Sequence, residues 1–299
     1  MARSRAVGFV APSGYLPDPR TLDRAAQLFA ARGWRVRAGA TCSERYLRFA
    51  GTDTLRAAEL QDFCTDRSLD LVLAARGGYG LTRILDRLDF EAIRRAGRTI
   101  CGYSDFTAFN LAYLAHAGGV SLHGPSATDF GAERPDTWTI DNFFTVLEAR
   151  DYETRFDAEG PDCEVEGTLW GGNLALVCTL IGTPHLPRVR GGIAFFEDVN
   201  EPAYKLERML LQLVHAGVLQ RQKAVLLGRF EPITPMPNDN GFSLDGVIAE
   251  LRARLPVPVV TGLPFGHVPR KLTLPVGAAV RLQTQGGIAR LSWRRLVAA

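Results

Sequence analysis

The sequence predicts an α/β protein: a doubly wound parallel sheet followed by a smaller, β-rich α+β domain. Over the first 125 residues, short apolar runs alternate with helical patterns, and this alternation is typical of right-handed βαβ units. Beyond residue 150, short β-like runs dominate and two helical patterns interrupt them. We therefore expect an N-terminal domain over residues 1–150, a linker over 151–170 and a C-terminal domain over 171–299.

The elements of the first domain follow from their local patterns. Residues 7–11 and 71–75 are apolar runs of the kind found in strands that helices cover on both faces. The apolar residues of 21–32 recur on one helical face until Gly33, which predicts a helix that ends there. Further strands are expected at 34–38, 99–102 and 120–122, and further helices at 56–64, 81–88 and 107–116.

The second half of the chain gives shorter signals. Residues 151–165 are polar and acidic, which indicates an extended linker. Between residues 204 and 219 the apolar side chains recur at helical spacing and predict an amphipathic helix, with a second helix at 242–255. We expect the remaining runs to form a partly closed, barrel-like sheet with strands at 193–196, 224–227, 257–261, 279–282 and 288–291.

The composition is that of a soluble globular protein, with 46% apolar and 22% charged residues in a chain of 299. The net charge is only +3 and the arginines are scattered, so we expect no nucleic-acid partner. No apolar run approaches the length of a membrane span, and the first residues do not have the pattern of a signal peptide. We therefore expect no membrane partner.

The cysteines indicate a reducing compartment. They are odd in number, widely spaced and contain no C-x-x-C pair, so neither a zinc ribbon nor a thioredoxin motif is expected. Such cysteines usually pack as small, buried apolar side chains, and a cytoplasmic location suits them. The five are Cys42, Cys64, Cys101, Cys163 and Cys178.

Ser104 is the candidate nucleophile. It lies in residues 102–107 (GYSDFT), between a predicted strand and a predicted helix. A serine on such a turn is exposed at the carboxyl edge of the sheet, where the helix N-terminus favours developing negative charge. Helix capping is the alternative explanation, and Phe106 stands where the G-x-S-x-G elbow has its second glycine. The case for a serine hydrolase therefore depends on the other segments.

A glycine-rich loop at residues 76–80 (RGGYG) follows the strand expected at 71–75. Gly77 or Gly78 is the candidate oxyanion donor, together with the backbone N–H of Asp105, because glycine lets backbone N–H groups approach a ligand closely. Arg76 is the candidate partner for a substrate carboxylate. A tight turn that requires positive φ is the alternative explanation of these glycines.

Glu197 and His267 are the candidate partners of the serine. Glu197 directly follows the apolar run 193–196, and a carboxylate buried there needs a hydrogen-bonded partner. His267 lies in residues 262–269 (GLPFGHVP), a loop stiffened by two prolines. A packing role is the commoner one for a single histidine. Asp198, the neighbour of Glu197, is expected to cap the helix at 204–219.

Together these motifs resemble, in composition and order, those of the LD-carboxypeptidases, the muramoyltetrapeptide carboxypeptidases of murein recycling. The motifs are residues 76–80 (RGGYG), 102–107 (GYSDFT), 167–174 (GTLWGGNL), 197–198 (ED) and 262–267 (GLPFGH). The resemblance implies a triad of Ser104, Glu197 and His267, a flavodoxin-like N-terminal domain and a homodimer. It also implies no metal, no cofactor and a murein tetrapeptide or muropeptide substrate that loses its terminal D-alanine.

Three alternatives stay open at this point. The same family includes microcin self-immunity peptidases, which act on a peptidyl or acyl-nucleotide substrate with the same triad. A metal-dependent hydrolase would use four candidate ligands, Asp105, Glu197, Asp198 and His267, but no H-x-x-x-H or similar spacing exists. A two-lobed binding protein would use Ser104 and the glycine-containing loops at residues 11–15 (APSGY) and 76–80 only to hold a ligand.

Overall fold

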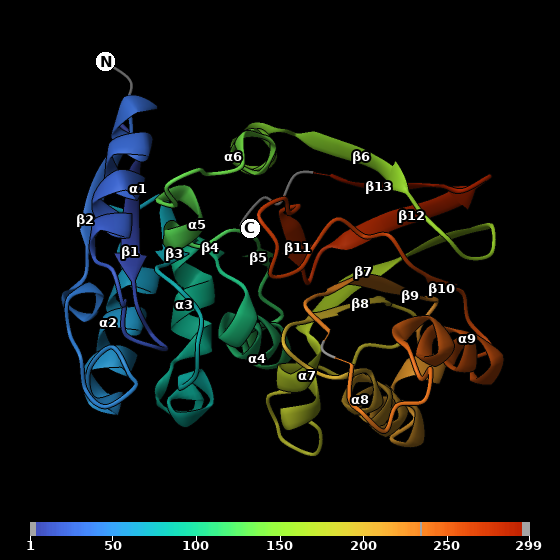
Figure 1. Cartoon of the computed structure of the whole chain (residues 1–299). Coiled ribbons are helices and arrows are strands. Elements are labelled where there is room, and N and C mark those ends of the chain that lie inside the picture. Colours follow the sequence, from blue (N-terminus) through green and yellow to red (C-terminus); the bar gives the residue numbers. More distant parts are fainter. Residues whose placement is uncertain (1–3, 234, 295–299) are drawn as a thin grey trace.

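The computed structural model describes residues 4–233 and 235–294, which form an α/β fold around two sheets. Figure 1 shows the sheets side by side: β1 to β5 of the N-terminal sheet are blue to green, and the strands of the C-terminal sheet range from light green to red. The six-stranded sheet has the order β11-β5-β4-β3-β1-β2, and the seven-stranded sheet has the order β10-β9-β8-β7-β12-β13-β6. The predicted fold class is confirmed.

The N-terminal sheet has five parallel strands with helices on both faces. Every residue of β1 is buried because neighbouring strands flank it and helices cover it. Helices α1, α5 and α6 lie on one side, where Phe29 packs against Phe130 and Phe143, and α2, α3 and α4 lie on the other (Figure 1). The strands are β1 (Ala6–Val10), β2 (Arg35–Ala38), β3 (Leu71–Ala74), β4 (Thr99–Cys101) and β5 (Ser121–His123). The helices are α1 (Arg20–Ala31), α2 (Asp53–Thr65), α3 (Phe90–Ala96), α4 (Thr107–Ala117), α5 (Ala127–Phe130) and α6 (Thr137–Glu148).

Two details of this half differ from the sequence prediction. The helix expected at 81–88 is a pair of 3₁₀ turns, Leu81–Arg83 and Leu85–Arg87, since apolar spacing alone does not separate the two helix types. Helix α3 was not predicted, although its signals were present. Asp89 caps its start by accepting from Ala92 N–H at 2.8 Å, and Gly97 ends it with a φ of 67°.

The C-terminal sheet is half parallel and half antiparallel. Strands β7 to β10 run parallel, whereas β12, β13 and β6 continue from β7 in antiparallel pairs. The sheet curls, so that Thr261, just after β10, donates its N–H to Glu159 O beyond β6 at 2.9 Å. The strands are β6 (Asp151–Asp157), β7 (Cys163–Asn173), β8 (Ile193–Asp198), β9 (Ala224–Phe230), β10 (Val259–Val260), β12 (Ala279–Gln285) and β13 (Ile288–Arg294). The helices are α7 (Leu174–Thr179), α8 (Ala203–His215) and α9 (Leu244–Arg254).

The linker expected at 151–170 is instead part of this sheet. Residues 151–157 form β6, an edge strand paired with β13, and β7 begins at Cys163. The segment is polar because an edge strand exposes alternate side chains, as β6 does around its buried Thr154 and Phe156. Polar composition alone therefore did not separate an edge strand from a linker.

A strand from late in the chain joins the first sheet. Strand β11 (Leu274–Val276) pairs antiparallel with β5, with Leu274 opposite His123 and Val276 opposite Ser121. Its Pro275 is tolerated because β11 is the edge strand. This pairing was not predicted, and it ties the segment that follows His267 to the N-terminal sheet.

No helix in the described part of the chain combines the length and the apolar character that a membrane crossing needs. The five cysteines are free, and burial raises the pKa of the Cys42 thiol to about 12. Among the described residues, no group of three or more His, Cys, Asp or Glu side chains is arranged to hold a metal ion.

Candidate active site

The nucleophile turn is a strained connection between β4 and α4. Ser104 begins a 3₁₀ turn over Ser104–Phe106 and has a φ of 63°, in the left-handed region that non-glycine residues rarely occupy. Such a conformation costs roughly 1–3 kcal/mol and persists only where the surroundings impose it. Gly77 packs directly on the serine, because a Cβ at Gly77 would lie 2.7 Å from Ser104 Oγ. The turn therefore presents the hydroxyl toward the glycine loop.

Ser104, His267 and Glu197 form one hydrogen-bonded chain. His267 Nε2 lies 3.0 Å from Ser104 Oγ, and His267 Nδ1 lies 2.7 Å from Glu197 Oε2. With an ionised Glu197, Nδ1 carries the proton, so Nε2 accepts from the serine hydroxyl. The Glu197 side chain is only 1% exposed and that of His267 is 18% exposed. The structure thus brings together three side chains that lie up to 163 positions apart in the sequence.

Backbone pairing positions the acid and the histidine. Glu197 lies near the carboxyl end of β8, opposite Asn173 of β7 in the parallel pair. The His267 loop is held against β9, where Arg229 donates its N–H to Phe265 O at 2.7 Å. Leu272, beyond His267, donates its N–H to Pro264 O at 2.8 Å and closes the loop. Both side chains are therefore fixed to the sheet before a substrate arrives.

The candidate oxyanion donors lie beside the serine. A Cβ on Gly77 would lie 3.3 Å from the backbone N of Asp105, so these two residues flank the same space. Gly78 has a φ of 112° and Gly80 a φ of 136°, as the tight-turn explanation expects. Glycine is needed at position 77 because Ser104 packs directly against it. At Gly78 and Gly80 glycine is needed because the backbone has a positive φ.

The side chain of Asp105 holds this loop in place. Its Oδ2 accepts from Leu81 N–H at 2.9 Å, and burial raises the pKa of the carboxyl. The fully buried Arg56 donates to Pro12 O and to Gly80 O, and so connects the loop at residues 11–15 to the glycine loop at residues 76–80. Helix α4 has no side-chain cap, so the capping explanation of this turn is wrong.

Arg76 lies on the glycine loop at residues 76–80. Its Nη1 donates to Tyr15 O at 2.6 Å, and it lies 3.4 Å from the position that a Cβ of Gly14 would take. Gly14 in turn donates its N–H to Gly77 O at 3.2 Å. Contacts through Gly14 and Gly77 therefore connect Arg76 to Ser104.

Asp198 has a different role from the one expected. Its Oδ1 accepts from Asn173 Nδ2 and its Oδ2 accepts from Ala175 N–H, both at 2.9 Å. Helix α8 begins at Pro202 without a side-chain cap. The prediction that Asp198 caps that helix is therefore wrong, and the carboxylate instead holds the start of α7. Burial is the main cause that raises the pKa of Asp198.

Sequence reasoning missed two contacts that join the halves of the site. Thr107 Oγ1 accepts from Asn173 N–H at 3.0 Å, which connects the start of α4 to the end of β7. The buried Lys271 donates to Tyr103 Oη at 3.1 Å, and the Tyr103 ring lies 5.2 Å from the His267 ring. A lysine inside the apolar run 271–276 (KLTLPV) was the available signal. A cavity of about 280 Å³ opens beside Tyr103, Lys271 and His267.

His123 lies beneath the site as a packing residue. Its ring lies 4.6 Å from Phe265 and 5.2 Å from Phe195, and its Nδ1 is 3.4 Å from Asn110 Nδ2. Burial, and then the positive charges of His267 and Lys271, lower the pKa of His123 to about 3. It is neutral at the seam between the two sheets.

Comparison with known proteins agrees with this geometry. The model of the LD-carboxypeptidase N-terminal domain matches residues 7–124, and that of the LD-carboxypeptidase C-terminal domain matches residues 166–282. The chain belongs to the LD-carboxypeptidase family. The family resemblance stated from the motifs is thereby confirmed.

Individual relatives span nearly the whole chain. The murein tetrapeptide carboxypeptidase of Pseudomonas aeruginosa is 30% identical over 301 residues, which cover 96% of this chain and 94% of the relative. A relative from Streptomyces coelicolor is 36% identical, with 97% of this chain and 94% of the relative covered.

Solved structures extend the comparison to the fold. The muramoyltetrapeptide carboxypeptidase from Oxalobacter formigenes is 39% identical in sequence. Its crystal structure matches with a TM-score of 0.92 over 97% of this chain and 98% of that one. The microcin C7 self immunity protein MccF shares the fold, with a TM-score of 0.89 at 22% identity, over 99% of this chain and 98% of that one.

Proposed function

We propose that this chain is a serine carboxypeptidase that cleaves the bond before the terminal D-alanine of murein tetrapeptides. The observation that carries the proposal is the hydrogen-bonded chain from Glu197 through His267 to Ser104, with the serine on a strained turn. The names of two similar proteins, from Pseudomonas aeruginosa and Oxalobacter formigenes, support the choice of substrate.

In the proposed reaction, Ser104 Oγ attacks the carbonyl carbon of the residue before D-alanine while His267 Nε2 takes its proton. The backbone N–H of Asp105 and that of Gly77 or Gly78 stabilise the oxyanion. His267 then protonates the amine of D-alanine, which leaves, and a serine ester remains. Water attacks that ester, again with His267 as the base, and regenerates Ser104. Glu197 stays ionised throughout and stabilises the charged imidazole.

We assign the terminal carboxylate of the substrate to Arg76. A guanidinium matches a carboxylate through paired N–H donors, and a carboxypeptidase needs a cation at this end of its substrate. The position of Arg76 next to the Gly14 and Gly77 contact supports the assignment. An Arg76→Gln variant should raise KM for the tetrapeptide more than it lowers kcat.

We also propose a cytoplasmic location and a homodimer. The free and mostly buried cysteines suit a reducing compartment, and the family resemblance is the basis for the dimer. Light scattering on the purified protein tests the dimer, and a mass of one chain would reject it.

The deciding experiment incubates the purified chain with murein tetrapeptide and measures released D-alanine. Release that persists after EDTA treatment supports a metal-independent serine mechanism. A parallel assay with an acyl-nucleotide substrate tests the microcin-immunity type of activity. Cleavage of that substrate without any release of D-alanine would replace the proposal with the alternative.

A further inference from the structure

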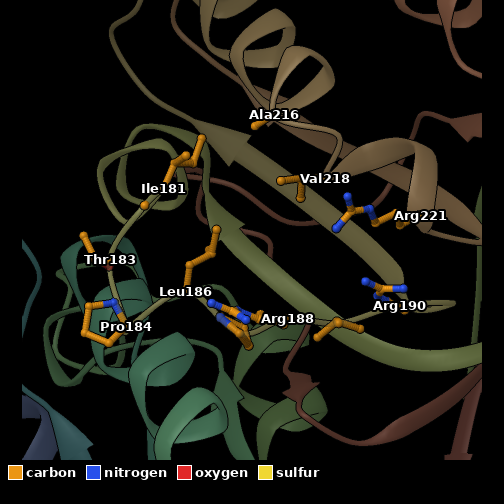
Figure 2. A pocket seen from close by; sticks show the side chains of 12 residues that line it. Ile181, Thr183, Pro184, Leu186, Arg188, Arg190, Ala216, Val218 and Arg221 are labelled. Atoms are coloured by element: carbon orange, nitrogen blue, oxygen red, sulfur yellow. The ribbon is translucent and has the colours of Figure 1, made fainter.

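A second cavity lies at the opposite end of β8 from Glu197. It has a volume of about 530 Å³, within the usual range of small-molecule sites. Its walls come from residues 181–190, which precede β8, and from the turn that follows α8 (Figure 2). The cavity lies before the start of β8 at Ile193, and the strand from Ile193 to Glu197 alone spans about 13 Å at about 3.3 Å per residue. The cavity is therefore distinct from the proposed active site.

Three arginines line this cavity without any counter-charge. Arg188, Arg190 and Arg221 are lining residues, and the lining contains no Asp or Glu. Within residues 4–233 and 235–294, none of the three forms an ion pair with a carboxylate. Figure 2 shows the guanidinium groups of Arg190 and Arg221 on one side of the cavity and that of Arg188 apart from them, nearer Leu186. Like charges gathered in a concave surface attract an anion.

A buried network fixes the segments that carry these arginines. Gln222 Nε2 donates to Val189 O at 3.0 Å and to Val218 O at 2.9 Å, and its Oε1 accepts from Trp170 Nε1 at 2.9 Å. Gly191 donates its N–H to Arg221 O at 2.7 Å. The two walls are thus held together before a ligand binds, which lowers the ordering cost of binding.

The carbonyl groups at the end of α8 do not neutralise the arginines. Val214 O already accepts from Gly217 N–H and from Gln220 Nε2, and Leu213 O accepts from Val218 N–H. The positive charge in the cavity is therefore available to a ligand.

The rest of the lining is apolar. Ile181, Leu186 and Val218 contribute aliphatic side chains beside the guanidinium groups (Figure 2). A ligand that fills the cavity therefore has a compact anionic end and an apolar body. The two guanidinium groups of Arg190 and Arg221 together provide more donors than one carboxylate accepts, whereas a phosphate offers three terminal oxygens.

We propose that this cavity is a binding site for a phosphate monoester that carries an apolar or ring-shaped body. The phosphate lies between Arg190 and Arg221, and Arg188 adds positive charge at the other side of the cavity. The body of the ligand covers Leu186 and Val218. This site is separate from the serine chemistry and does not depend on the proposed function.

Isothermal titration calorimetry with phenyl phosphate tests the proposal. We expect saturable binding of one ligand per chain, tighter than that of inorganic phosphate because the ring covers apolar side chains. The double variant Arg190→Gln, Arg221→Gln should weaken phenyl phosphate binding by about tenfold or more, since charge-assisted hydrogen bonds are lost. Arg208→Gln, an exposed arginine on α8 outside the cavity, is the matched control and should bind like the wild type.

Tetrapeptide hydrolysis measured on the same variants separates this proposal from the proposed function. The double variant should hydrolyse the tetrapeptide at the wild-type rate, because the cavity does not contact the triad. Unsaturable binding, or equal affinity in the wild type and the double variant, would overturn the proposal. So would competition between phenyl phosphate and the tetrapeptide, or a double variant that changes only the oligomeric state.

Discussion

The two halves of the candidate site are held by different means. On the N-terminal side, backbone conformation positions the nucleophile: Ser104 has a φ of 63° and Gly77 packs against it. On the C-terminal side, side-chain hydrogen bonds position Glu197 and His267 at the ends of regular strands and a closed loop. We therefore expect the N-terminal half to tolerate changes of charge better than changes of shape, and the C-terminal half to show the opposite behaviour.

The largest loss of activity is expected when His267, the base in the C-terminal half of the site, is removed. His267→Ala should lower kcat for D-alanine release by about 10⁴- to 10⁶-fold, because the members of a triad act as a unit. Steady-state kinetics on murein tetrapeptide measure this. A loss of less than tenfold would mean that the N-terminal half works without the histidine.

A smaller loss is expected when the acid keeps its shape but loses its charge. Glu197→Gln should lower kcat by about 10⁴-fold, since the amide no longer fixes the imidazole tautomer or stabilises its charged form. Asp198→Asn is the matched control, because Asp198 bonds to Asn173 and α7 rather than to His267. If the control were the inactive variant, the orienting acid would be Asp198.

The Asp105 side chain tests whether shape governs the N-terminal half. Asp105→Ala removes the acceptor for Leu81 N–H, so the glycine loop loses its anchor, and kcat should fall about 100-fold with little change in KM. Asp105→Asn keeps a carbonyl oxygen and should recover most of the rate. Equal rates for the two variants would show that the anchor is not needed.

The smallest effect concerns the pH dependence of protein stability that arises from His123, which is buried between the two sheets. The pKa of His123 is about 3 in the folded protein against about 6.5 in an unfolded chain. As the pH falls below 6.5 the unfolded state binds a proton that the folded state excludes, so the free energy of unfolding falls.

Replacing His123 by phenylalanine should remove this dependence. Between pH 7 and pH 5, the wild type should lose about 2 kcal/mol more stability than His123→Phe, at about 1.4 kcal/mol per pH unit. Urea denaturation at both pH values measures the difference. Parallel losses in the two proteins would show that His123 is accessible to protons.

The contrast between the two halves of the site also explains which of its features the sequence predicted. The nucleophile turn was recognisable because strand, turn, serine and helix are consecutive at residues 99–117. Glu197 and His267 were assigned as candidates, but their contact with Ser104 depends on the parallel β7–β8 pair and on the loop held at β9. The anchor between Asp105 and Leu81 and the contact between Lys271 and Tyr103 were missed, because each joins side chains or backbone groups on separate segments. Strand β6 was missed because its exposed edge resembles a linker.

The most direct test of the central claim is the rate of D-alanine release by Ser104→Ala. The substitution removes only the hydroxyl, and an alanine has the same Cβ in the same turn, so the thermal unfolding midpoint should stay close to that of the wild type. We expect release of D-alanine from murein tetrapeptide to fall by at least about 10⁴-fold. A folded Ser104→Ala protein with a rate within tenfold of the wild type would contradict the account.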